Sequence, residues 1–143
     1  MLCAVVAVGA AGCGGDADPI AVNTSSGDHS WGEVHTGRTI TVSATPPDEV
    51  STRDGYDAWR TTIVVTNQGQ RPFNMGWLTT GASADGARQS ELVDPRLGCN
   101  GIAQGPTVLP GETLAVMGCW PGSDQRLVSL SWGGVTESAM FSD

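Results

Sequence analysis

The side chains that could hold a metal ion lie close together near residue 30. Imidazole and carboxylate groups fall within eight positions there, and they belong to Asp28, His29, Glu33 and His35. Such a mixture of nitrogen and oxygen donors is typical of zinc and copper sites. Metal ligands also need a packed scaffold behind them, whereas residues 14–36 are rich in Gly, Ser and Asp without an apolar period. We therefore expect solvated side chains here and no bound metal.

A second group of carboxylates precedes the β-branched run at residues 59–66, and it consists of Asp48, Glu49, Asp54 and Asp57. Carboxylate oxygens suit Ca²⁺, and a pair of carboxyls across a cleft is what glycoside hydrolysis needs. A domain of this size seldom builds such a cleft, so we expect a solvated acidic loop. No Gly-x-Ser-x-Gly motif occurs, and both histidines precede residue 36. The sequence predicts no catalytic residue, no cofactor and no enzyme activity.

The chain has four cysteines, of which Cys3 and Cys13 lie in its first thirteen residues. The other two, Cys99 and Cys119, show no C-x-x-C spacing, and no His follows His35. A copper–thiolate site needs a His nearby, so a metal or nucleophile role lacks the required partners. Two such cysteines in an oxidising compartment form a disulfide. We predict one between Cys99 and Cys119.

The first twelve residues are apolar and uncharged, and they end in Ala10-Ala11-Gly12-Cys13. About 20 apolar residues are needed to span a bilayer, so this shorter run is typical of the apolar region of a signal peptide. The final tetrad resembles a bacterial lipobox. That resemblance implies a diacylglyceryl group on Cys13, which would become the mature N-terminus and bind the membrane. No Lys or Arg precedes Cys13, so we expect the natural start to lie upstream.

The chain carries seven basic residues, all Arg, against fifteen acidic ones, which gives a formal net charge of −8. Proteins that bind nucleic acid cluster basic residues to neutralise phosphates, so we expect no nucleic-acid partner. The same balance excludes polybasic docking on anionic lipids. The absence of Lys, with abundant Ala, Gly and Arg, indicates a GC-rich actinobacterial genome. The residues after position 12 suffice for one domain, which we expect to be a monomer.

Short strands separated by turn signals fill the second part of the chain. Alternating or β-branched runs predict strands at residues 39–45, 59–66, 73–80, 88–93, 113–119, 126–132 and 135–141. Residues 81–86 and 133–134 are predicted hairpin connections. About seven strands with turns every 8–12 residues are typical of an immunoglobulin-like antiparallel β-sandwich. We therefore predict a signal peptide at 1–12, a flexible tether at 13–35 and the sandwich at 36–143.

The order of these turn signals resembles one family of exported domains, the immunoglobulin-like extracellular antigens with immunoprotective activity and related lipoproteins of actinobacteria. The resemblance rests on three motifs: Trp59-x-x-x-Ile63-Val64-Val65-Thr66-Asn67-x-Gly69-x-x-Pro72-Phe73, Ala84-Asp85-Gly86 and Leu109-Pro110-Gly111-Glu112-Thr113. It covers residues 36–143 and implies a sandwich fold. A disulfide is not a general feature of that family, and the family implies no activity.

The tryptophans offer the remaining candidate for function. Trp77 and Trp120 neighbour turns, so they are candidates for a binding surface as well as for core packing. We expect a lipid-anchored, non-enzymatic binding module on the extracytoplasmic face of the cell membrane, which presents a sandwich end to a protein or envelope ligand. The alternative is an envelope protein that carries a metal or a small ligand.

Overall fold

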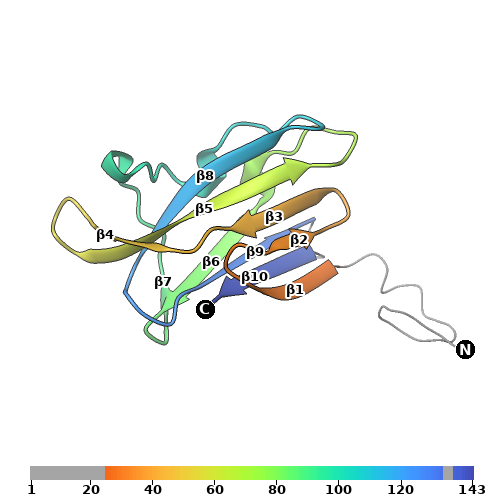
Figure 1. Cartoon of the computed structure of the whole chain (residues 1–143). Coiled ribbons are helices and arrows are strands. Elements are labelled where there is room, and N and C mark those ends of the chain that lie inside the picture. The colour runs from red at the N-terminus through yellow and green to blue at the C-terminus, as the bar shows by residue number, and fades with distance from the viewer. Residues whose placement is uncertain (1–24, 134–136) are drawn as a thin grey trace, which may run out of the picture.

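The computed structural model describes residues 25–133 and 137–143, and these residues form two packed β-sheets (Figure 1). The strands are β1 (Ser25–Ser30), β2 (Val34–Thr36), β3 (Ile40–Ala44), β4 (Asp48–Ser51), β5 (Asp57–Asn67), β6 (Thr79–Ala84), β7 (Ala87–Gln89), β8 (Thr113–Pro121), β9 (Leu127–Trp132) and β10 (Glu137–Ser142). Short 3-10 turns interrupt the connections at η3 (Met75–Trp77), η4 (Pro95–Leu97) and η5 (Ile102–Gln104).

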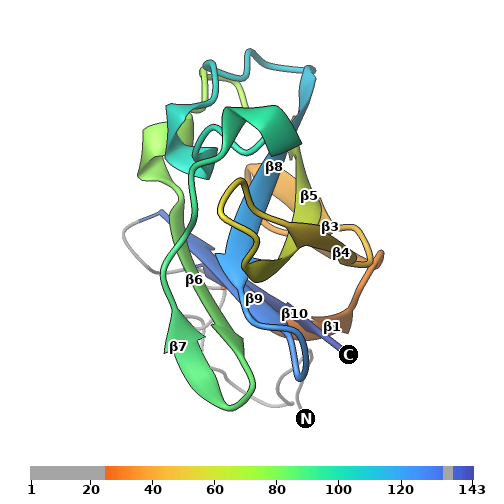
Figure 2. The same cartoon turned by 90° about the vertical axis from the view of Figure 1, so that its left-hand side faces the viewer.

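The strand order is that of an immunoglobulin-like sandwich. One sheet runs β1-β10-β9-β6-β7, and the other runs β2-β3-β5-β4, with β8 also paired to β5. Figure 2 shows the two layers crossing. Central strands β5 and β9 each pair with strands distant in sequence, as the second and sixth strands of an immunoglobulin domain do. The pairs are antiparallel except that β1 runs parallel to β10. The predicted sandwich is confirmed.

Aromatic side chains fill the space between the sheets. Trp59, Trp120, Trp132 and Phe141 are at most 2% exposed, and the rings of Trp59 and Trp120 lie 4.9 Å apart between centroids. Each faces inward because alternate residues of a strand share one face. The placement of Trp120 in a binding surface is therefore wrong, since Trp120 is 1% exposed and packs on its cross-strand partner Trp59.

The sandwich begins earlier than the sequence predicts. Strand β1 pairs with β10 along its whole length, and β2 pairs with β3, so residues 25–35 belong to the domain and not to a tether. Trp31, in the turn between β1 and β2, packs edge-on against Trp59 with centroids 6.1 Å apart and donates from Nε1 to Asp143 at 2.8 Å. The predicted signal peptide and residues 13–24 of the predicted tether lie outside the described residues.

Two other boundaries differ from the prediction. The predicted strand at 73–80 is interrupted by the turn η3 at residues 75–77, and β6 starts only at Thr79. The side chain of Asn74 accepts from the backbone N–H of Gly76 at 2.7 Å and closes this tight turn. The connection from β6 to β7 is accordingly shorter than predicted and centres on Asp85 and Gly86, both with positive φ. Strand β4, in the predicted acidic loop, pairs with β5.

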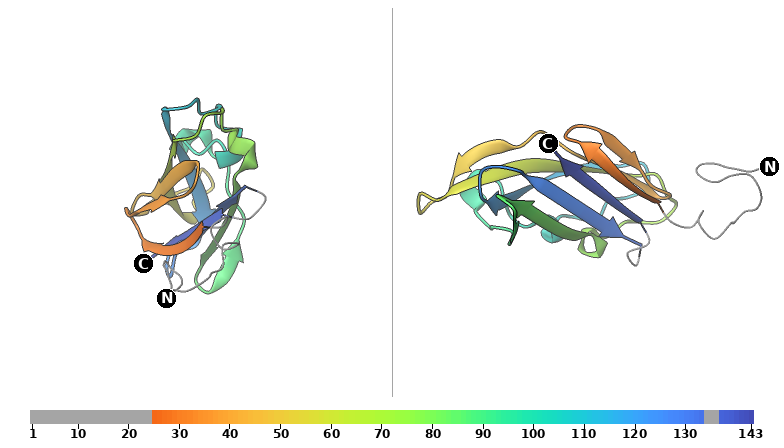
Figure 3. Two further views of the ribbon diagram at one scale, coloured as in Figure 1. Left: turned by 90° about the vertical axis from the view of Figure 1, so that its right-hand side faces the viewer. Right: turned by 90° about the horizontal axis from the view of Figure 1, so that it is seen from below.

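The sandwich is elongated, and the described part of the chain begins at one of its two ends. Ser25 pairs with Glu137 at the start of β10, beside the turn after β2 and the connection from β5 to β6; we call this the tether end. The opposite end, the far end, holds the turns at residues 52–56, 85–86 and 122–126. Figure 3 shows these two ends in its right-hand view. Strand β5 has 11 residues, which separates the ends by roughly 35 Å.

Candidate functional site

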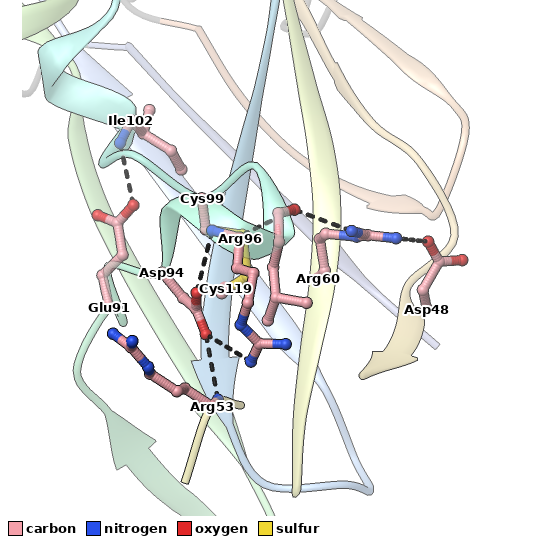
Figure 4. Close-up of a disulfide and its surroundings, with 10 residues drawn as sticks. Asp48, Arg53, Arg60, Glu91, Asp94, Arg96, Cys99, Ile102 and Cys119 are labelled. Carbon is pink, nitrogen blue, oxygen red and sulfur yellow. Dashed lines mark hydrogen bonds and ion pairs between the residues drawn. A yellow bond between two sulfur atoms is a disulfide. The ribbon is translucent and has the colours of Figure 1, made fainter. Parts of the chain in front are cut away.

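The predicted disulfide is present at the side of β8 (Figure 4). Cys99, which follows η4, is bonded to Cys119 near the end of β8, with Cα atoms 5.9 Å apart. Both residues are fully buried. Backbone bonds reinforce the link, because Leu92 N donates to Cys119 O at 2.8 Å and Asp94 N donates to Cys99 O at 2.8 Å. The bond therefore holds the long connection between β7 and β8 against the sheet, which is a structural role.

Charged side chains secure the same connection from β5. Arg60 donates from Nη1 to Leu97 O at 2.8 Å and pairs through Nη2 with Asp48 at 3.2 Å. The carboxylate of Asp94 caps η4 by accepting from Arg96 N at 3.1 Å. Asp48 thus serves an ion pair at the surface (Figure 4), and nothing in this cluster resembles a pair of catalytic carboxylates.

The two histidines form a partly buried pair between β1 and β2. His29 Nε2 and His35 Nδ1 lie 2.9 Å apart, and the ring of His29 stacks on Phe141 with centroids 5.4 Å apart. Glu33 approaches His29 Nδ1 at 3.5 Å. Within residues 25–133 and 137–143, no group of three or more His, Cys, Asp and Glu is arranged to hold a metal ion.

Burial lowers the pKa of His35, and the neighbouring His29 lowers that pKa further, while Glu137 acts in the opposite direction. The unfolded chain therefore binds a proton at His35 at higher pH than the folded chain does. Stability from this group is present above its ordinary pKa of about 6.5 and falls as the pH drops below it. The hydrogen bond between His35 and His29 also needs at least one neutral ring, because a protonated imidazole can only donate.

We expect the free energy of unfolding to fall between pH 7.5 and 5.5, and His35→Asn to remove part of that dependence. The Asn side chain keeps a polar atom near the position of Nδ1 but does not titrate in this range. The slope attributable to His35 cannot exceed about 1.4 kcal/mol per pH unit. Urea unfolding at several pH values, with the difference between the two proteins taken at each, measures it. A constant difference across the range would contradict this account.

A groove of about 730 Å³ opens at the tether end. Phe73 and Trp77 line it and meet edge-to-face, with centroids 5.7 Å apart and ring planes at 89°. Phe73 is buried, whereas Trp77 is 59% exposed. Trp132 and Arg71 also line the groove. The candidate residue Trp77 is therefore accessible, and Phe73 from the connection between β5 and β6 and Trp132 from β9 line the same groove.

A side-chain amide orders the loop on one side of this groove. Asn67, at the end of β5, is 1% exposed and donates to Arg71 O at 2.7 Å and to Val108 O at 2.8 Å. Its carbonyl oxygen accepts from Gly69 N at 2.9 Å. A backbone ladder between Phe73 and Val108 continues this arrangement. Phe73, which carries one of the aromatic rings of the groove, is therefore held in place without a ligand.

Two residues that line the groove carry buried polar groups. The indole Nε1 of Trp132 is buried and has no hydrogen-bond partner, although buried polar groups in proteins are nearly always bonded. The carboxylate of Glu137, which is 2% exposed, accepts from Arg38 N at 2.7 Å and pairs with Arg38 Nε at 3.6 Å. The sequence pattern identified neither Trp132 nor Glu137 as a site residue, because the alternation of a strand indicates burial but not proximity to a cavity.

No protein-family model matches the chain, and no curated protein matches it significantly in sequence. Similar solved structures include an uncharacterised β-sandwich protein of Clostridium difficile 630, with 11% identity and a TM-score of 0.54 over 83% of this chain and 95% of that one. Another is the "putative lipoprotein (ycdA)" of Bacillus subtilis subsp. subtilis strain 168, with 10% identity and a TM-score of 0.59 over 77% of this chain.

These likenesses establish the β-sandwich fold. The chain spans only 38% of the Bacillus subtilis protein. The resemblance to the actinobacterial antigens stays a prediction, because neither neighbour is described as one. Among the described residues, no helix is both long and apolar enough to cross a bilayer.

Proposed function

We propose that the protein is a lipoprotein, anchored through Cys13 on the extracytoplasmic face of the cell membrane, whose sandwich binds an envelope ligand without catalysis. The tetrad ending at Cys13 and the fold shared with a "putative lipoprotein" support the anchor. The observation that carries the binding role is the groove at the tether end, which exposed Trp77 lines together with Phe73 and Trp132. A ligand with an apolar portion fits this aromatic lining.

Non-enzymatic action is part of this proposal. Asp48 forms an ion pair, Asp94 caps η4, and Glu137 accepts from a backbone N–H. The two histidines are hydrogen-bonded to each other. The alternative of a ligand carrier uses the same groove, so it differs only in whether the ligand is released elsewhere. Metal analysis of the purified domain tests the metal-carrying version of that alternative, and a stoichiometric metal would overturn the non-metal proposal.

The anchor is tested by Cys13→Ala in a bacterium that processes lipoproteins. We expect the variant to lose incorporation of labelled fatty acid and to leave the washed membrane fraction, because the thioether carries the acyl chains that hold the protein there. Immunoblots of membranes and medium, together with the label, give the measurement. Cys3→Ala is the matched control, since Cys3 lies within the predicted signal peptide, and it should remain acylated and membrane-bound. A Cys13→Ala protein that is still labelled would contradict the proposal.

A further inference from the structure

We infer that the groove at the tether end rests against the lipid head-group layer of the membrane that carries the anchor, and that phospholipid is its ligand. The inference depends on the proposed anchoring through Cys13. It identifies the partner of the groove by position, by aromatic content and by charge, and each of these is an independent property of the described residues.

The chain leaves the folded domain beside the groove. Ser25 pairs with Glu137, and Glu137 lines the groove. Eleven residues separate Cys13 from Ser25, and a chain of that length spans at most about 40 Å. An anchor at Cys13 therefore keeps this end of the sandwich within reach of the bilayer surface, while the far end lies roughly 35 Å beyond it.

The same end exposes the side chains that suit an interface between water and lipid. Trp77 is 59% exposed, and Leu109, in the adjoining turn before β8, is 48% exposed. Tryptophan is enriched at the head-group level of membranes because its ring is apolar and its N–H needs a polar partner. The phosphate and ester oxygens of phospholipids are such acceptors.

The charge of the domain is distributed along its long axis. The tether end carries four charged side chains that cancel one another, which are Arg38, Arg71, Glu112 and Glu137. The far end carries seven of the fifteen acidic residues, namely Asp48, Glu49, Asp54, Asp57, Asp85, Asp124 and Asp143. Four arginines lie at the same end, Arg53, Arg60, Arg88 and Arg126, and two of them pair with Asp48 and Asp143. This end therefore stays net negative, within a chain of net charge −8. An anionic leaflet attracts cations and repels anions at its surface. It would therefore turn the far end outward and accept the neutral, aromatic end.

Chemical attachment to lipid tests the orientation without relying on the processing of the signal. Residues 13–143, with the disulfide intact, have a single thiol at Cys13, which can be coupled to a maleimide lipid in vesicles of phosphatidylglycerol and phosphatidylcholine. Brominated acyl chains quench tryptophans that lie close to the bilayer. We expect bromine-dependent loss of fluorescence in the wild-type chain, and we expect Trp77→Phe to abolish most of that loss. Trp31→Phe is the matched control, and it should leave the loss intact.

A second attachment point makes the test specific for the groove. Residues 14–143 with Asp54→Cys couple to the same lipid from the far end, and bromine should then quench little of the fluorescence. The inference is overturned if attachment at Cys13 gives no bromine-dependent loss, or if Trp77→Phe leaves that loss unchanged. It is likewise overturned by equal quenching from both attachment points. Because the thiol is coupled chemically, these results are independent of whether Cys13 is acylated in cells, which the Cys13→Ala experiment decides.

Discussion

Trp120→Ala is expected to lower the free energy of unfolding by about 3–5 kcal/mol, the largest effect among the substitutions considered. Trp120 is 1% exposed, and its ring lies against that of Trp59 with centroids 4.9 Å apart. Removal of the indole leaves a cavity between two sheets that are held by strand pairing and cannot close over it. It also removes an aromatic pair worth about 0.5–1.5 kcal/mol beyond the buried area. Urea unfolding followed by far-UV circular dichroism measures the change.

Trp77→Ala is the matched control for that experiment. Trp77 is 59% exposed and meets Phe73 edge-to-face, so removal of its ring should cost less than about 1 kcal/mol. Similar losses in the two variants would contradict the division into a core tryptophan and a surface tryptophan. A small effect of Trp120→Ala would mean that the two sheets do not pack as described.

The double variant Cys99→Ala/Cys119→Ala is expected to lower the free energy of unfolding by about 3 kcal/mol. The disulfide closes a loop across a sequence separation of 20, and the loss comes mainly from the greater conformational freedom of the unfolded chain. The connection between β7 and β8 would remain on the sheet through the hydrogen bond from Arg60 to Leu97 O. The fold should therefore persist, with an unchanged circular dichroism spectrum at 25 °C.

Reduced wild-type protein separates the cross-link from the cavities that the two alanines leave. Both cysteines are fully buried, so reduction will require partial unfolding or a denaturant. We expect the reduced protein and the double variant to unfold within about 1 kcal/mol of each other, because the two removed sulfur atoms are small. A double variant as stable as the oxidised protein would show that the bond does not constrain the unfolded chain.

The central strands could be predicted from the sequence because their pattern is set by burial. Residues 40–44 of β3 alternate between fully buried and half-buried side chains, and the sequence shows the same alternation of apolar and hydroxyl residues. Strand β5 likewise buries every second residue over most of its length. Where one face of a strand meets the core, the alternation is visible without the structure.

The edge strands could not be predicted in this way. Strand β1 has the sequence SSGDHS, which contains no aliphatic residue, and it is held by parallel pairing with β10 and by the rings of His29 and Phe141. The pairing partner lies more than a hundred residues away, so no local pattern reports it. For the same reason the sequence places the histidine pair in a tether, whereas the structure shows it partly buried.

The groove illustrates a second limit. Trp77 could be singled out because an aromatic residue beside a turn is a common feature of binding surfaces. Its partners come from other strands, and the turn signals do not say which strand ends meet. The exposures of Trp77 and Trp120 differ because one lies in the 3-10 turn η3 and the other on the inward face of β8. A position next to a turn signal is compatible with both outcomes.

Mass analysis of the mature N-terminus tests the central claim most directly. Arg38 is the first basic residue of the chain, so trypsin releases a single N-terminal peptide that ends there. From protein extracted from washed membranes, we predict a peptide that begins at Cys13 and carries the mass of a diacylglyceryl group. A peptide that retains residues before Cys13, or one that begins elsewhere and has no acyl mass, would contradict the account.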